Sequence, residues 1–128
     1  MRQELNERLF KAYPTLLPPN RSLMESLMAF GCECGDGWYP IIDKLFSNLS
    51  MDPSLEVIQV KEKFGGLRVY LNSYTDEADR LIAEAELQAL ATCEVCGEEG
   101  TLGSTGYWLS TRCPKCAPPN WTPVKEEE

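Results

Sequence analysis

The chain has 128 residues, of which 43% are hydrophobic and 25% charged, and its formal net charge is −8 at pH 7. These values are typical of one globular domain, and no apolar run approaches the roughly 20 residues that a membrane-spanning helix needs. The acidic balance disfavours nucleic acid as a partner, and the absence of histidine excludes Ser-His-Asp triads and zinc sites with mixed cysteine and histidine ligands.

The N-terminal residues lack the pattern of a signal peptide, because charges recur at Glu7, Arg8 and Lys11. We therefore expect a cytoplasmic protein, in which six cysteines fit thiols and metal ligands better than disulfides. Apolar side chains spaced four residues apart predict a first helix over residues 2–13, which Pro14 stops.

A second, short helix is predicted between Ser22 and Gly31. Ser22 and Glu25 have the spacing of a capping box, and Gly31 suits the C-terminal end of a helix. The side chains expected to point inward are Leu23, Leu27 and Phe30.

A turn rich in glycine follows over residues 32–40, and Pro40 suits the first turn of a third helix. This helix is expected to run to about Ser50. Its buried side chains would be Ile41, Ile42, Leu45 and Leu49.

Residues 55–72 carry the strongest strand signal. Two apolar runs, 57–64 and 67–71, flank Gly65-Gly66, which predicts a hairpin with these glycines as its two-residue turn. Alternation assigns to the core side Ile58, Val60, Leu67, Val69 and Leu71. The opposite face would then carry Gln59, Lys61, Lys63, Arg68 and Tyr70.

A fourth helix is predicted after Thr75, which is placed to cap a first turn holding Asp76 and Glu77. Its buried stripe would consist of Ala78, Leu81, Ile82, Ala85 and Ala89. Leu87 points the opposite way and is expected on the surface.

Four cysteines, Cys93, Cys96, Cys113 and Cys116, form two C-x2-C pairs with sixteen residues between them. This spacing is typical of a tetrahedral four-cysteine zinc site, in which each pair chelates the metal from a tight turn. The alternatives are two structural disulfides or cysteines buried as small apolar groups. We predict one structural Zn²⁺ per chain, since a site with four sulfur ligands has no open position for catalysis.

The hairpin face with Lys61, Lys63, Arg68 and Tyr70 holds the only clustered positive charge in the sequence. It could contact phosphates or an acidic protein partner. A solvated sheet face explains it as well, because lysines discourage edge aggregation and pair with nearby glutamates. This second interpretation is favoured, since exposed ion pairs contribute little.

Three aromatic side chains, Tyr107, Trp108 and Trp121, lie in the zinc module. Stacking on bases and covering of the metal knuckles explain them equally well. Leu87 and Trp108 are candidate partner-binding residues, because they are apolar and have no evident core role.

Cys32 and Cys34 could form a reactive thiol pair with Asp36 as acid or base, but buried thiols at a turn are commoner, and no cation or histidine is near in sequence to activate them. Asp36 and Trp38 could form a ligand pocket. The simpler alternative is that Asp36 bonds the backbone of its turn or caps the next helix, and that Trp38 packs in the core.

Two strings, Cys34-Gly35-Asp36-Gly37-Trp38 and Lys61-Glu62-Lys63-Phe64-Gly65-Gly66-Leu67-Arg68, together resemble a family of small bacteriophage and bacterial proteins. In that family a similar C-x2-C module often follows, as at Cys93–Cys96 here. The resemblance covers roughly residues 30–116. It carries no defined activity, and implies an accessory protein of the kind with which phages bind host machinery or block host defences.

We therefore expect an α+β fold with helices packed on a small antiparallel sheet, a central β-hairpin, and a C-terminal four-cysteine zinc ribbon. The expected parts are a helical and hairpin domain over 1–92, a zinc ribbon over 93–121 packed on it, and an acidic tail over 122–128. The predicted function is that of a non-enzymatic protein-binding accessory protein, acting on a host or defence protein if the gene is phage-borne. The alternatives are a nucleic-acid-binding zinc ribbon and, third, an Asp- or Cys-dependent enzyme.

Overall fold

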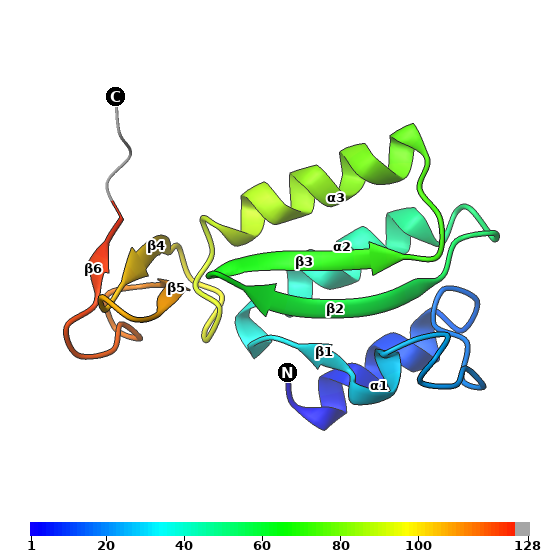
Figure 1. Cartoon of the computed structure of the whole chain (residues 1–128), viewed down its shortest axis with the longest axis horizontal. Coiled ribbons are helices and arrows are strands. Elements are labelled where there is room, and N and C mark those ends of the chain that lie inside the picture. The colour runs from blue at the N-terminus through cyan, green and yellow to red at the C-terminus, as the bar shows by residue number, and fades with distance from the viewer. Residues whose placement is uncertain (125–128) are drawn as a thin grey trace.

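The computed structural model describes residues 1–124 and has the expected α+β architecture (Figure 1). The predicted triplet Glu126–Glu128 of the acidic tail lies outside the described residues. The helices are α1 (Gln3–Ala12), η1 (Met28–Phe30, 3-10), η2 (Asp36–Trp38, 3-10), α2 (Tyr39–Leu49) and α3 (Asp76–Ala89). The strands are β1 (Cys32–Glu33), β2 (Val57–Lys63), β3 (Gly66–Leu71), β4 (Thr101–Ser104), β5 (Leu109–Arg112) and β6 (Thr122–Pro123).

The first sheet has the strand order β1-β2-β3. β2 and β3 form the predicted antiparallel hairpin, but β1 pairs with β2 in parallel, so the sheet is mixed and not purely antiparallel. The sequence did not predict β1, because a strand of two residues has no periodicity to detect.

The three α-helices agree with the predicted stripes. Leu5 and Leu9 of α1 are buried, and Thr75 accepts the expected capping bond from the N–H of Ala78 at 3.0 Å. α2 lies between the other two helices: it packs along α3, and the ring of Tyr13 meets that of Phe46 edge-on at 6.0 Å. The core gathers around the most deeply buried large side chains, Trp38, Phe46, Ile42, Leu67 and Val60.

The predicted register of β2 is wrong at its start. Val57 is opposite Leu71 and Gln59 is opposite Tyr70, so Ile58 is an extra, bulged residue. The bulge puts Val57 on the core side with Val60 and leaves Ile58 half-buried.

The hairpin turn lies one residue earlier than predicted. Lys63 pairs with Gly66, so Phe64 and Gly65 are the two turn residues, with φ of 54° and 82°. Two positive φ values are what a type I′ turn requires, and a phenylalanine in the first of them is unusual.

The helix predicted between Ser22 and Gly31 is also wrong. Glu25 does accept a bond from the N–H of Ser22 at 3.1 Å, as in a capping box, but only a turn and then η1 follow. The side chains of Leu23 and Phe30 are exposed, whereas Met28 is buried. The N–H of Leu27 donates to the carbonyl of the bulged Ile58 at 2.7 Å, so the sheet takes the bond that a helix would have used.

The second sheet is the ribbon, with strand order β5-β4-β6 and antiparallel pairing throughout. β6 extends it to Pro123, two residues beyond the predicted end of the module at 121. Figure 1 shows the ribbon at one end of the molecule, beside the hairpin turn and the last turn of α3. Within residues 1–124, no helix combines the length and the apolar character needed to cross a membrane.

Candidate metal centre

The four cysteines of the two C-x2-C pairs form one cluster. Their ligand atoms all lie within 4.8 Å of one another, and the Sγ atoms of Cys96 and Cys113 are 3.6 Å apart. Four sulfurs about 2.3 Å from a central zinc ion would be roughly 3.8 Å apart, whereas a disulfide needs about 2.05 Å. All six cysteines of the chain are free thiols. The cluster therefore has the dimensions of a metal site, and no disulfide is formed.

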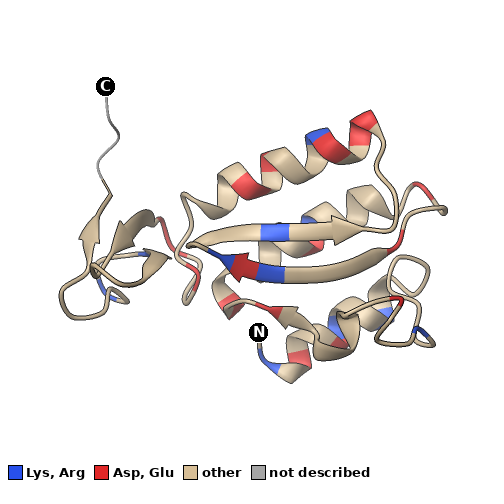
Figure 2. Cartoon of the chain, in the orientation of Figure 1, with Lys and Arg blue, Asp and Glu red and all other residues tan. Residues whose placement is uncertain are grey.

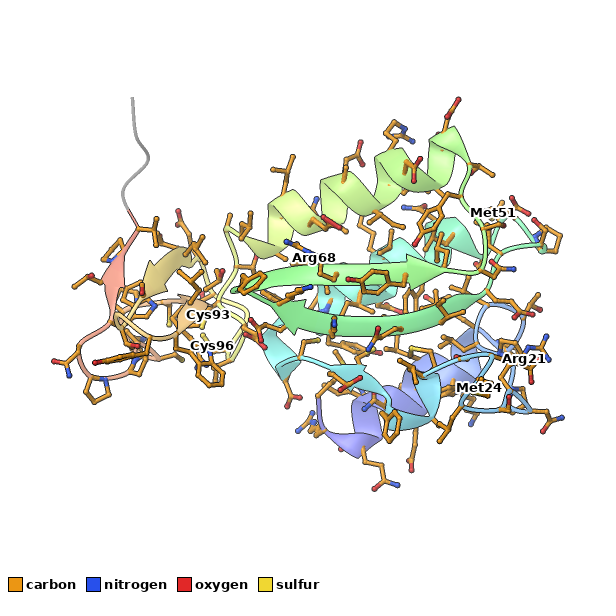
Figure 3. The ribbon with its side chains drawn as sticks, in the orientation of Figure 1. Arg21, Met24, Met51, Arg68, Cys93 and Cys96 are labelled. Atoms are coloured by element: carbon orange, nitrogen blue, oxygen red, sulfur yellow. The ribbon has the colours of Figure 1, made fainter. Side chains whose placement is uncertain are left out.

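Two tight turns place the sulfurs. In the first, the N–H of Gly97 donates to the carbonyl of Cys93 at 3.0 Å, and Gly97 has a φ of 81° that favours glycine. In the second, the N–H of Cys116 donates to the carbonyl of Cys113 at 3.1 Å. The cluster thus draws one pair of ligands from the turn before β4 and the other from the turn after β5 (Figure 3).

The environment of Cys93 favours the thiolate form that metal binding needs. Burial raises the pKa of this thiol, but backbone N–H groups, that of Cys96 first among them, outweigh the burial and bring the pKa down to about 7. A four-thiol cluster of this kind fits a soft or borderline cation.

The ribbon docks on the glycine-rich turn at residues 35–37 of the body (residues 1–92), and the body contributes backbone N–H groups to this contact. The N–H of Gly37 donates to the carbonyl of Glu94 at 2.7 Å, and the N–H of Gly35 donates to the Glu94 carboxylate at 2.8 Å. A Cβ at Gly37 would lie 2.1 Å from the carbonyl oxygen of Cys93. The turn and the first metal knuckle therefore touch at a distance that only glycine permits.

The hairpin turn forms a second contact with the ribbon. The hydroxyl of Thr111, on β5, is fully buried and donates to the carbonyl of Gly65 at 2.8 Å. The carbonyl of Thr111 in turn accepts from the N–H of Glu94 at 3.0 Å. Both sequence strings that carry the family resemblance thus supply a turn against which the metal-binding ribbon packs.

Sequence reasoning missed Glu94 and Thr111 as docking residues. Burial raises the pKa of the Glu94 carboxyl, and its bond from Gly35 partly offsets this effect. The signal in the sequence was the glycine pair around Asp36, which indicates close backbone approach but does not say to which segment.

Asp36 and Trp38 do not form the pocket that the sequence left possible. Trp38 is completely buried, and its indole N–H donates to the carbonyl of Thr92 at 2.9 Å, so its ring has no surface for a ligand. Asp36 accepts from the backbone N–H of Arg2 at 2.8 Å, which ties α1 to the turn. The simpler alternative is confirmed for Trp38 but is wrong for Asp36, which bonds the backbone of Arg2 and neither its own turn nor the start of the next helix.

Cys32 and Cys34 are buried beside this turn. Burial raises the pKa of Cys32 to about 12 and raises that of Cys34 further. Both thiols are therefore protonated at neutral pH and poorly suited to nucleophilic or redox chemistry.

The basic hairpin residues share one face, as Lys61 is opposite Arg68 and Gln59 is opposite Tyr70. Their charges already have local partners: the Lys61 ammonium lies 5.8 Å from the centre of the Tyr70 ring, and Arg68 lies 3.9 Å from Glu86. Figure 2 shows blue and red segments side by side on β2, a blue segment on β3, and further red segments along α3.

The candidate partner-binding apolar residues are on the surface. The side chain of Leu87 is 70% exposed and that of Trp108 is 66% exposed, with a fully exposed Tyr107 beside it. Trp121 differs, because its ring packs on Gly103 and its indole N–H donates to the carbonyl of Ser110 at 3.2 Å. Of the three aromatic residues, only Trp121 covers the ribbon.

Comparison with protein-family models, with curated proteins and with solved structures finds no match to this chain. The resemblance noted from the two sequence strings stays a prediction.

Proposed function

We propose that this chain is a non-enzymatic protein-binding accessory protein whose ribbon is held together by one structural zinc ion. Cys93, Cys96, Cys113 and Cys116 would hold the ion, which would join the two knuckles of the ribbon. A metal with four protein sulfurs has no free position for a substrate, so the role that suits it is stability.

The docking contacts support this role for the metal. The knuckle of Cys93 and Cys96 is the same segment that bonds to Gly35 and Gly37. An ion that fixes this knuckle would also fix the position of the ribbon on the body, because the contacts pass through backbone atoms between the two ligands.

The observation that carries protein binding is the exposed pair Tyr107–Trp108 at the turn between β4 and β5. Exposed aromatic residues are enriched where proteins meet, and neither ring contributes to the buried core. If the gene is phage-borne, as the resemblance implies, the partner is a host or defence protein.

A comparative pull-down with quantitative mass spectrometry tests the proposal. Trp108→Ala should lose a partner that the unaltered protein captures, while Phe30→Ala, which removes an aromatic ring of similar exposure from the body, should retain it. Equal capture by both variants would contradict the proposed surface. Loss of activity in vivo by Asp36→Asn with zinc content and binding intact would favour catalysis instead.

A further inference from the structure

A groove of about 450 Å³ lies between the end of α2 and the first half of α3. Its apolar lining comes from Leu49, Leu55, Ala78 and the half-buried Leu81, and Met51 stands at its edge with 83% of its surface exposed. Figure 3 shows Met51 at this end of the molecule, on the connection that leaves α2. A flexible thioether at the mouth of an apolar groove suits contact with a partner side chain.

The groove has an acidic rim. Asp52, Glu77 and Glu84 line it together with a single cation, Arg80, so three carboxylates face one guanidinium and the net charge is −2. Arg80 is already engaged, at 2.5 Å with Glu77 and 2.7 Å with Glu84. Figure 2 shows further carboxylates along the same helix.

Helix stability explains only part of this acidity. Asp76 and Glu77 lie in the first turn of α3, where negative charge favours the helix dipole, and Asp52 bonds to Ser54 in its own turn. Glu84 lies in the third turn, beyond the reach of the dipole, and shares Arg80 with Glu77, so one guanidinium faces two carboxylates at this rim.

A second, much smaller hollow of about 30 Å³ follows along the seam between α2 and α3. It shares Asn48, Leu81 and Glu84 with the groove and adds Ile41, Gln88 and one cation, Lys44. From Glu77 to Gln88 the seam follows about 16 Å of α3, the length of roughly three helical turns.

We propose that the α2–α3 groove binds a basic amphipathic helical segment of a protein partner. An apolar side chain of this segment enters beside Met51 and Leu81, and lysine or arginine residues that flank it face Glu84 and Asp52. This inference rests on the proposed protein-binding function and adds the site and the chemistry of the partner. Charge complementarity selects the segment, and apolar contact holds it.

The test uses the zinc-loaded full chain and a synthetic helical peptide of about 14 residues, with leucines at i, i+3, i+4 and i+7 and lysines elsewhere. Glu84→Lys should weaken the binding of this peptide by about tenfold or more, and Met51→Ser by several-fold. Glu4→Lys is the matched control, because Glu4 pairs with Arg8 on α1 at the same i,i+4 spacing and exposure as Glu84 with Arg80. It should change the dissociation constant less than about twofold.

Three results would overturn the inference: no binding of the basic peptide, equal weakening by Glu4→Lys and Glu84→Lys, or equal binding of a peptide with glutamates in place of its lysines. The first two would show no site or only diffuse electrostatic attraction. A partner captured through Trp108 together with any of these results would leave the proposed function standing without the groove.

Discussion

Gly37 shows at the scale of one residue how the body and the ribbon are joined. Its missing side chain leaves room for three backbone atoms of the knuckle, from Cys93, Glu94 and Gly97, all of which a Cβ would approach within 2.7 Å. Backbone atoms of a metal-binding turn cannot swing aside as the end of a flexible side chain can. The glycine is therefore required by the neighbouring segment and not by its own φ.

Gly37→Ala should lower the free energy of unfolding by at least about 2 kcal/mol, since overpacking against backbone forces the two parts apart. The matched control is Gly66→Ala, where the new Cβ would meet only the end of the Arg68 side chain at 3.1 Å. This control should cost less than about 1 kcal/mol. Urea denaturation measures both, and similar losses would contradict the close contact.

The six cysteines fall, residue by residue, into two groups with different chemistry. Cys32 and Cys34 are buried thiols with raised pKa values, whereas the four clustered cysteines form the metal site, in which Cys96 is exposed and Cys93 and Cys113 are buried. Removal of the metal should loosen the two knuckles and expose all four. Iodoacetamide at about pH 8 should label neither Cys32 nor Cys34 in the folded protein. After chelation of the metal it should label the other four, and mass spectrometry counts the adducts. Modification of Cys32 before chelation would contradict the burial.

At the scale of elements, the sequence predicted what local periodicity controls. The stripes of α1, α2 and α3 and the antiparallel pairing of β2 with β3 were predicted correctly, whereas the bulge at Ile58 and the exact turn residues were not. The helix at 22–30 was wrong because a capping box is a local signal, and the bond from Leu27 to the bulged Ile58 is not. Tertiary contacts also determine the formation of β1, because its pairing partner in β2 lies almost thirty residues away in the sequence.

The bulge in β2 predicts which of two neighbouring substitutions destabilises the protein more, and simple alternation of the strand predicts the opposite order. Val57→Ala removes methyl groups from the core and should cost about 1–3 kcal/mol, whereas Ile58→Ala, at the half-buried bulge, should cost less despite losing a larger side chain. Thermal or urea unfolding of the two variants measures the order. A greater loss of stability for Ile58→Ala would support the alternating register instead of the bulge.

At the scale of the whole molecule, the body and the ribbon form two sheets held together by turns. The sequence predicted the metal cluster from its cysteine spacing, because two C-x2-C knuckles can meet at one ion with little help from the rest of the fold. It predicted that the ribbon packs on the rest of the chain but not where, since the contacts of Gly35, Gly37 and Gly65 with the ribbon use backbone atoms that any residue carries.

Metal loss should therefore affect more than the ribbon. Cys93→Ser removes one ligand and loosens the knuckle that contacts Gly37, so it should destabilise the chain far more than Cys32→Ser, which alters one buried thiol. Unfolding followed by fluorescence suits this comparison, because Trp38 donates its indole bond to Thr92 next to the knuckle. Equal losses of stability from both substitutions would show that the docking of the ribbon does not depend on the metal.

The metal content of the purified protein tests the central claim most directly. Elemental analysis, combined with native mass spectrometry, should give one zinc ion per chain, and Cys93→Ser should abolish it. A folded, metal-free protein with disulfides at Cys93–Cys96 and Cys113–Cys116 would contradict the structural zinc centre.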